Sequence, residues 1–355
     1  MNLREVVEKI GPEDQGAREE AHRRWSACAK PLGGLGFLET VVENVAALTG
    51  SAAVDFSHRA LLVLCADNGV VAQGVTQSPS SVTAAVAGNL AAGRSSVCMM
   101  AKVARCRVVP VDMGILDFSG LPGLLDRRMG NGTQDISVGP AMTRRQAEQA
   151  VLTGIELVRE QQEQGCRLLA TGEMGIGNTT TSSAVACMLL GRQVQELTGR
   201  GAGLSDQGLR RKIEMIPRAI AVNRPDPEDP LDVLSKLGGF DIAGLCGIFL
   251  GGALYGIPVL IDGVISSAAA LCAERLCPNS AKAMVASHVS QEPASRLLLE
   301  VLGKRPLITA GMHLGEGTGA VAAIPLLDMA LAVYQGSSTF DETGIEAYQP
   351  LGGQP

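Results

Sequence analysis

Residues 167–180 read RLLATGEMGIGNTT, and this stretch decides the fold. Its first part, Arg167–Thr171, is a short apolar run typical of a strand that is covered on both faces. A glycine-rich turn containing Glu173 follows, and a run of small residues typical of a buried helix comes next. Strand, turn and helix in this order indicate one unit of a parallel α/β sheet. A second such unit has the turn Gly315–Ala320 after the apolar run Pro306–Ala310.

Six apolar runs in the chain have the hydrophobicity of such strands. They are Ala60–Ala66, Arg107–Val111, Arg167–Ala170, Ile257–Ile261, Lys282–Ala286 and Pro306–Ala310. Segments long enough for helices separate most of them, and the clearest is Thr143–Gln164, with Thr143 as its N-cap. The alternation predicts an α/β fold with a doubly wound, mainly parallel, six-stranded sheet of Rossmann-like type.

The two ends of the chain lack strand patterning and carry helical runs instead. We therefore expect a small helical domain built from residues 1–55 and 326–355, beside a large α/β catalytic domain of residues 56–325. The tail after Tyr348 is expected to be disordered, because it contains two Gly and two Pro among its few residues.

Composition excludes several classes of protein. The formal net charge of −6 gives no electrostatic footprint for nucleic acid. The nine Cys are scattered through apolar stretches without a CxxC spacing, which favours reduced, buried thiols in a cytoplasmic protein. The four His show no metal-ligand spacing, so we expect no metal site. The uncharged stretch Ile242–Ile261 has the length of a membrane span, but its glycines and Pro258 favour a buried helix followed by a strand.

Polar clusters follow the predicted strands. Because the carboxyl ends of parallel strands meet at one edge of a sheet, we expect these clusters to form a ligand site there. The clusters are Asp67-Asn68-Gly69, Asp112-Met113-Gly114, Thr171-Gly172-Glu173, Asp262-Gly263, Ser287–Ser290 and Gly315-Glu316-Gly317.

The two glycine turns suit chemistry at a phosphorylated small molecule. Glycine allows backbone N–H groups to approach a ligand closely, and a helix N-terminus favours an anion. The amides of Gly175, Ile176 and Gly177, with Asn178 and Thr179, are therefore candidates for holding a phosphate. A Glu in such a turn does not help the anion. We expect it to face a hydroxyl or an acidic proton of a second substrate, which indicates transfer chemistry.

Seven motifs together resemble one known family, the nicotinate-nucleotide–dimethylbenzimidazole phosphoribosyltransferases of cobamide lower-ligand assembly. The resemblance runs in order from about residue 25 to residue 345. The motifs are Lys30–Glu39, Cys65–Val70 with Ser78-Pro79, Gly172–Thr180, Gly199–Leu204, Asp262-Gly263, Ser287–Pro293 and Leu314–Ala320.

The resemblance implies transfer of the 5-phosphoribosyl group of nicotinate mononucleotide to an aromatic acceptor, with inversion and release of nicotinate. The nucleotide is a substrate, and no cofactor is implied. Glu316 matches the family's catalytic base, and Glu173 matches a residue beside the nucleotide. Further nucleotide contacts are expected from Gly201, Lys212, Asp262, Ser290 and Gly315, and an acceptor slot from Ser78, Pro79, Val86, Met174 and Leu314.

Several of these residues also have plain structural interpretations. Glu316 could be a carboxylate stabilised by a helix dipole, and Glu173 could brace its own loop. Lys212, beside Arg210 and Arg211, could belong to a solvated basic face. Asp262 could be structural, and Met174 could fill the core.

The sequence also departs from the family's pattern. Asn68 stands where His is usual, His313 where Arg is usual, and Ala294-Ser295 where Gly-His is usual. Val86 occupies a position that can carry Gln in enzymes that use benzimidazole. These departures leave the acceptor open between 5,6-dimethylbenzimidazole and a phenol such as phenol or p-cresol.

The sequence also has two alternative functional interpretations. The family's site is completed by a neighbouring protomer, so we expect a dimer, either a homodimer or a heterodimer in which this chain is a weakly active paralogue of a sister subunit. A dinucleotide-binding oxidoreductase is disfavoured, because no strand is followed by G-x-G-x-x-G with an acidic residue about 20 residues later.

Overall fold

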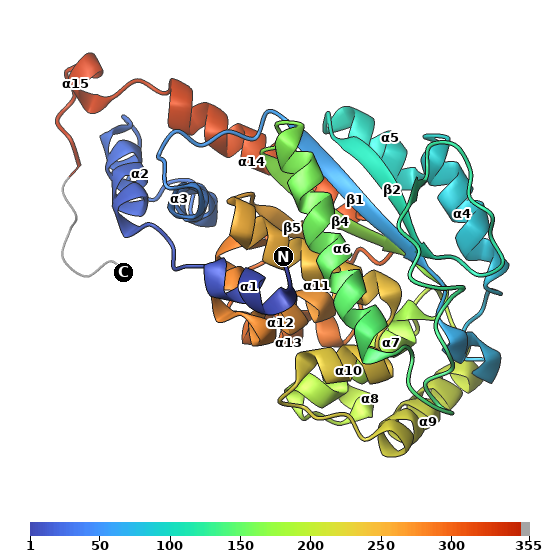
Figure 1. The fold of residues 1–355 in the computed structure, drawn as a ribbon. Coiled ribbons are helices and arrows are strands. Elements are labelled where there is room, and N and C mark those ends of the chain that lie inside the picture. The colour runs from blue at the N-terminus through green and yellow to red at the C-terminus, as the bar shows by residue number, and fades with distance from the viewer. Residues whose placement is uncertain (349–355) are drawn as a thin grey trace.

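The computed structural model describes residues 1–348 and has one six-stranded sheet, in which every paired strand is parallel (Figure 1). The strand order is β3-β2-β1-β4-β5-β6. The strands are β1 (Arg59–Ala66), β2 (Arg107–Gly114), β3 (Leu125–Asp126), β4 (Leu168–Met174), β5 (Val259–Ile261) and β6 (Met284–Ala286). Because the order reverses between β1 and β4, a crevice for a ligand is expected at the carboxyl ends of these strands.

The predicted fold class is confirmed, and five of the predicted runs coincide with β1, β2, β4, β5 and β6. The sixth run, Pro306–Ala310, is not a strand. Only Ile308 bridges to His288, and Thr309 and Ala310 are exposed, so this run is not covered on both faces. Pro306 also lacks the N–H that a ladder needs. The sixth strand is instead β3, whose two residues are too few to give a sequence pattern.

Helices cover both faces of the sheet, because alternate residues of each strand point to opposite sides. In β1, Leu62 and Leu64 belong to one apolar cluster, and Leu61 and Val63 belong to the other. The first cluster contains residues of α1 (Leu3–Lys9), α6 (Arg144–Glu163), α7 (Asn178–Leu190), α8 (Val194–Leu197), α9 (Asp206–Asn223), α10 (Pro230–Leu237), α11 (Phe240–Tyr255), α12 (Val264–Leu276) and α13 (Ala294–Val301). The second contains residues of α2 (Gln15–Ala27), α3 (Phe37–Thr49), α4 (Ser81–Ala91), α5 (Ser96–Val103) and α14 (Thr318–Gly336).

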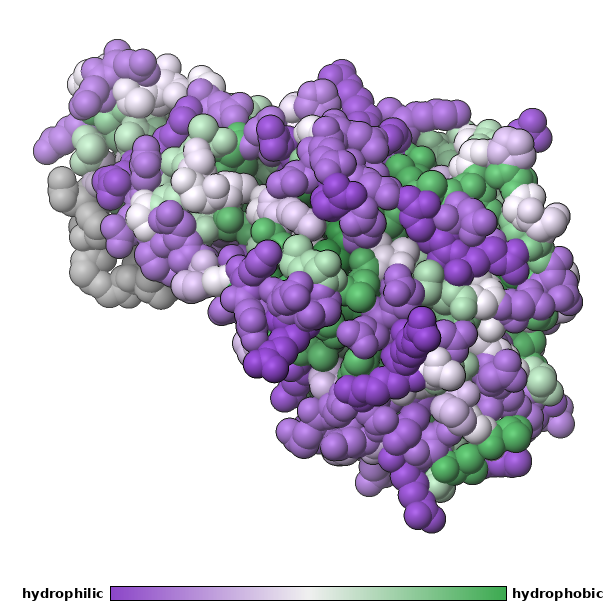
Figure 2. All heavy atoms as spheres, viewed as in Figure 1, coloured by the Kyte–Doolittle hydropathy of each residue, from purple (hydrophilic) through white to green (hydrophobic). Residues whose placement is uncertain are grey.

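Short elements complete the chain: the 3-10 helices Gly69–Gln73 and Pro278–Ala283, and the helix α15 (Phe340–Thr343). The predicted N-cap Thr143 forms a capping box at the start of α6. Figure 2 shows mainly hydrophilic residues along the outward side of α6, so this helix turns its apolar side to the sheet. All nine Cys are free and buried.

The uncharged stretch Ile242–Ile261 forms most of α11 and then β5, as predicted. Helix α11 lies against α6 with almost no side chain between them. A Cβ added at Gly154 of α6 would lie 2.0 Å from the carbonyl oxygen of Gly244, and one at Gly247 would lie 1.9 Å from that of Val151. Glycine is required at this crossing because the two backbones touch.

Among the described residues, α14 is the one helix long and apolar enough to cross a membrane. Ala320, Val321 and Ile324 in its first half are buried in the second apolar cluster. This part of the helix is therefore a core helix of the α/β fold.

The N-terminal helices α2 and α3 lie beyond one end of the sheet, near α15 and where α14 extends from the sheet (Figure 1). The rings of Trp25 and Tyr334 lie 4.9 Å apart there. Helix α1 lies elsewhere, with Leu3 and Val6 buried in the cluster that contains α6 and α11. A small domain built from both ends stays a proposal, and it would not include α1. The expected disorder after Tyr348 concerns residues outside the described range.

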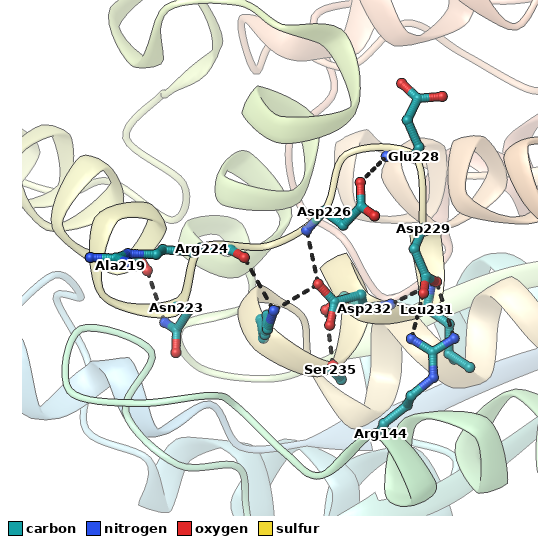
Figure 3. Close-up of polar contacts among 11 residues, drawn as sticks. Arg144, Ala219, Asn223, Arg224, Asp226, Glu228, Asp229, Leu231, Asp232 and Ser235 are labelled. Carbon is teal, nitrogen blue, oxygen red and sulfur yellow. Dashed lines mark hydrogen bonds and ion pairs between the residues drawn. The ribbon is translucent and has the colours of Figure 1, made fainter.

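The connection between α9 and α10 is held by a polar network (Figure 3). Asp229 caps α10 and pairs with Arg144 of α6 at 2.6 Å. The N–H of Asp226 donates to Asp232 Oδ2 at 2.8 Å, and Nδ2 of Asn223 donates to the carbonyl of Ile136 at 2.7 Å. These contacts fix the C-terminal end of α9, the helix that carries Lys212.

Candidate functional site

A cavity of about 260 Å³ opens at the carboxyl ends of β4, β5 and β6. It lies beside the place between β1 and β4 where the strand order reverses and a ligand is expected. Its walls come from the segments that follow these strands, from the turn at Gly315 and from α4. The lining residues are Ser78, Val82, Glu173, Met174, Gly175, Ile176, Asn178, Thr179, Gly201, Ala202, Asp262, Gly263, Val264, Ile265, His288, Ser290, Glu292, His313, Leu314, Gly315 and Glu316.

Two of the expected polar clusters do not reach this cavity. Asp67 accepts hydrogen bonds from Thr83 Oγ1 at 2.7 Å and from the N–H of Leu116 at 2.9 Å. Asp112 accepts from the N–H groups of Gly114 and Ile115. Both carboxylates brace the loops after β1 and β2, so the expectation that all six clusters form the site is wrong for these two.

The two glycine turns that carry Glu173 and Glu316 pack against each other. A Cβ at Gly172 would lie 2.6 Å from the backbone oxygen of Glu316, and a Cβ at Gly315 would lie 3.0 Å from Glu173 Oε1. Glycine at these positions lets the two turns lie this close, and both carboxyl groups enter one cavity. Glu316 Oε2 accepts from the N–H of Val97 at 3.4 Å, in the first turn of α5.

Glu173 is 6% exposed and is joined to a second buried carboxyl group. Nδ2 of Asn178 donates to Glu173 Oε2 and also to Asp241 Oδ2, the latter at 3.0 Å. Burial, with the nearby charge of Asp241, raises the pKa of Glu173 to about 8. Burial raises the pKa of Asp241 to about 6.

The predicted phosphate loop forms the N-terminus of α7, with Gly177 at φ 97° as its N-cap. The amide of Ile176 donates to Thr83 Oγ1 at 3.1 Å, and the amide of Asn178 donates to the Gly175 carbonyl at 3.1 Å. These two amides are therefore already used, which corrects their expected role as free donors. Gly177 borders a neighbouring hollow, which shares the wall residues Gly175, Ile176, Asn178 and Thr179 with the main cavity.

Lys212 is buried behind this loop, with 1% exposure, so it does not belong to a solvated basic face. Its Nζ donates to Thr179 Oγ1 at 2.9 Å and to the Gly199 carbonyl at 3.2 Å. Burial lowers its pKa to about 8, and Glu292 opposes that shift. Glu292 also accepts from the amide of Gly201 at 2.9 Å, and both residues line the cavity.

Asp262 both lines the cavity and supports the fold. Its Oδ1 accepts from the N–H of Ala320 at 2.9 Å in the first turn of α14, and it lies 3.9 Å from His288 Nδ1. Burial raises the pKa of Asp262, and His288 opposes the shift. Ser290 lies beside it on the wall, and its buried Oγ has no hydrogen-bond partner among the described residues.

Of the predicted acceptor residues, Ser78, Met174 and Leu314 line the cavity, whereas Pro79 and Val86 do not. Met174 also packs, partly buried, against the second apolar cluster, so it both lines the cavity and contributes to the core. Val82 takes the place expected of Val86, one turn earlier on α4.

The departures from the family pattern fall mainly behind the cavity. Asn68 is buried and accepts from Thr181 Oγ1 at 2.9 Å. Ser295 Oγ accepts from the N–H of Ser290 at 2.9 Å. His313 alone among the departures lines the cavity.

Several residues of the site were not predicted, among them Val82, Ala202, Val264, Ile265, His288 and Glu292 on the wall and Asp241 beside Asn178. His288 and Glu292 lie within the motif Ser287–Pro293. Their closeness in sequence to Ser290, a predicted nucleotide contact, could have indicated that they belong to the site. Asp241 had no local signal, because it reaches Asn178 across 63 residues of sequence.

Comparison with known proteins identifies the family of this site. A family model described as phosphoribosyltransferase matches residues 10–345. A protein from Ruminiclostridium cellulolyticum named nicotinate-nucleotide–dimethylbenzimidazole phosphoribosyltransferase is 44% identical over 351 residues, which are 99% of this chain and 100% of that protein. A protein of the same name from Acetivibrio thermocellus is 44% identical over 348 residues, 98% of this chain and 99% of its own length.

The fold agrees with that result. The crystal structure of CobT from Thermus thermophilus matches with a TM-score of 0.89 at 39% identity, covering 94% of this chain and all of that one. Sequence, fold and the cavity with its two glutamates lead to one assignment: the chain is a phosphoribosyltransferase that belongs to the nicotinate-nucleotide–dimethylbenzimidazole phosphoribosyltransferase family.

Proposed function

We propose that this enzyme transfers the 5-phosphoribosyl group of nicotinate mononucleotide to an aromatic lower-ligand acceptor in cobamide biosynthesis. The bond between the anomeric carbon and the nicotinate nitrogen breaks, and a new bond forms to the acceptor on the opposite face. The products are an α-riboside phosphate and nicotinate. The acceptor's proton passes to Glu316.

The observation that carries this proposal is the meeting of two glycine turns in one cavity, where Glu316 faces the same space as the loop before α7. One part of such a site can hold an anion while the other removes a proton. Because nicotinate leaves from a pyridinium, the leaving group needs no acid. We therefore propose that the reaction uses no cofactor beyond its two substrates.

The nucleotide phosphate is proposed to bind between α7 and α12. Ser290, the backbone at Gly175 and Gly201, and the N-terminus of α12 after Gly263 all border this part of the cavity. Lys212 lies behind Thr179 and adds positive charge to the same region while it is protonated. These groups suit a phosphate through hydrogen bonds and the helix dipole.

The acceptor is proposed to lie against Val82, Met174 and Leu314, which form the apolar part of the wall. 5,6-Dimethylbenzimidazole is the first candidate, since the related proteins carry that substrate in their names. A phenol is the second candidate. What favours it is the replacement of an expected Arg by His313 on this wall, and its hydroxyl proton would also pass to Glu316.

A dimer is proposed as the working form, either of identical chains or with a paralogous sister subunit. Exposed apolar side chains on two adjoining helices support it: Met329 of α14 is 57% exposed, and Met99 and Val103 of α5 are 46% and 82% exposed. A cytoplasmic location is also proposed, because all nine Cys are free and buried.

The test is nicotinate release from nicotinate mononucleotide by the purified chain, with 5,6-dimethylbenzimidazole, phenol or p-cresol, each with and without a metal chelator. We expect release that depends on an acceptor and does not change with the chelator. Turnover with the benzimidazole alone would reject the phenol. Nucleotide binding without turnover, restored only by a sister chain, would reject the self-sufficient enzyme in favour of the paired subunit.

A further inference from the structure

Two carboxyl groups share one amide at the base of the cavity. Nδ2 of Asn178 donates to both Glu173 and Asp241, so the two groups lie within hydrogen-bond reach of a single atom. The other charged groups that act on Glu173 are Asp262 and Glu316, which are also carboxyl groups. Ionising both members of this pair without a cation would carry a high electrostatic cost, so one of them keeps its proton.

Geometry decides which carboxyl group keeps the proton. Asp241 lies in the first turn of the 16-residue helix α11, where backbone N–H groups and the helix dipole favour an anion. Glu173 is the residue before the last of β4 and does not lie in the first turn of a helix. The pKa values, about 6 for Asp241 and about 8 for Glu173, agree with this order. At pH 7 Asp241 is therefore ionised, and Glu173 is neutral.

The proton of Glu173 faces the cavity. Oε2 is occupied by the Asn178 amide, whereas Oε1 has no hydrogen-bond partner among the described residues. The side chain is more than nine-tenths buried and lines the cavity beside Gly315. An O–H on Oε1 can thus be donated to a ligand in the cavity.

We propose that Glu173 is a neutral carboxylic acid that donates Oε1–H to a ribose hydroxyl oxygen of the nucleotide, and that Asp241 is the positioning residue that keeps the proton there. This inference rests on the function proposed above. It also accounts for the entry of a phosphate into a cavity that carboxyl groups border, because a neutral Glu173 removes one negative charge from its wall.

The proposal has a definite pH dependence. Raising the pH through about 8 ionises Glu173, which removes the donor and adds a charge that repels the phosphate. Affinity for nicotinate mononucleotide should fall about tenfold between pH 7 and pH 9 from this group. Asp241→Asn removes a negative neighbour and lowers the pKa of Glu173, so the fall should begin at lower pH.

The other titrating groups are all kept in Glu173→Gln. Asp67 acts on Asp241, His288 acts on Asp262, and the buried Cys65 keeps its proton because burial raises its pKa well above the usual value. Lys212 also loses its proton near pH 8. The contribution of Glu173 is therefore the difference between the alkaline loss of nucleotide affinity in the wild type and that in Glu173→Gln. This variant keeps a neutral donor of the same size.

The experiment is calorimetric binding of nicotinate mononucleotide from pH 6.5 to pH 9 by the wild type, Glu173→Gln and Asp241→Asn. We expect Glu173→Gln to bind within about threefold of the wild type at pH 7 and to lose less affinity at high pH. Binding about a hundredfold weaker at pH 7, or an alkaline fall equal to that of the wild type, would overturn the proposal.

An infrared measurement separates this inference from the proposed function. A protonated carboxyl group gives a carbonyl band that a carboxylate lacks, and that band should be present in the wild type at pH 7 and reduced in Glu173→Gln. If the wild type did not bind the nucleotide, the proposed function would fail. The carbonyl band would still show whether Glu173 is protonated. Equal bands in the two proteins would overturn the neutral acid.

Discussion

Glu316 has a backbone conformation that few side chains adopt, with φ at 59°. A left-handed conformation costs a residue other than glycine roughly 1–2 kcal/mol. The neighbours Gly315 and Gly317 both have φ of 88°, so the whole turn is built around positive φ. Glycine at position 316 would remove the strain. The presence of Glu in this conformation is consistent with a functional role for its carboxylate.

Two substitutions test this residue. Glu316→Gln should lower kcat by roughly 10²–10⁴-fold, the usual contribution of a positioned base, while nucleotide binding persists. Glu316→Gly should abolish transfer and raise the free energy of unfolding by about 1 kcal/mol, since the strain is lost. Steady-state kinetics and urea unfolding measure these changes. Near-normal turnover of Glu316→Gln would refute the base, and a less stable Glu316→Gly would refute the strain.

The sequence predicted the site residues that lie in glycine-rich turns. It missed the residues that only tertiary contacts bring to the site. Glu173 and Glu316 stand in glycine turns, so their exposure to a ligand could be inferred locally. Asp241 looks like an ordinary acid in the first turn of a helix, and its partner Asn178 is distant in sequence. Val82 and Val86 lie one helical turn apart, a difference that only packing resolves.

Helix α7 depends on glycine at both of its ends, which makes a matched pair of substitutions available. A Cβ at Gly177, the N-cap with φ 97°, would lie 3.0 Å from Asn68 Cβ and 3.0 Å from Val71 Cγ2. Gly191, the C-cap with φ 60°, has nothing within 4 Å of an added Cβ. Both substitutions strain the backbone, but only the first crowds the loop beside the cavity.

Gly177→Val should therefore weaken nucleotide binding by on the order of tenfold to a hundredfold, because a small displacement of the loop misplaces its contacts. Gly191→Val should lose stability but bind the nucleotide normally. Calorimetric titration of both variants measures the contrast. Equal affinities in the two would show that the phosphate does not depend on this loop.

Apolar sequence patterns predicted the buried strands but not the short pairings at the edges of the sheet. Continuous apolar runs predicted β1, β2, β4, β5 and β6 because these strands are covered on both faces. Strand β3 pairs with β2 through only two residues, Leu125 and Asp126, and it has no pattern to find. Ile308 continues the sheet as a single bridge.

For the whole molecule, the two chain ends and the sheet share one apolar cluster. Trp25, the only Trp of the chain, belongs to it together with Leu61 and Val63 of β1. We expect Trp fluorescence and far-ultraviolet circular dichroism to report one coincident unfolding transition in urea. A fluorescence change that clearly precedes the loss of helix would show that the terminal segments form a separately stable domain.

The central claim is transfer of a phosphoribosyl group rather than its hydrolysis. The most direct measurement is an NMR analysis of the products formed by the purified enzyme from nicotinate mononucleotide and 5,6-dimethylbenzimidazole. The account predicts nicotinate and the α-riboside phosphate of the acceptor in equal amounts, and almost none of either with Glu316→Gln. Nicotinate accompanied by free ribose 5-phosphate, or a product with the β configuration, would contradict it.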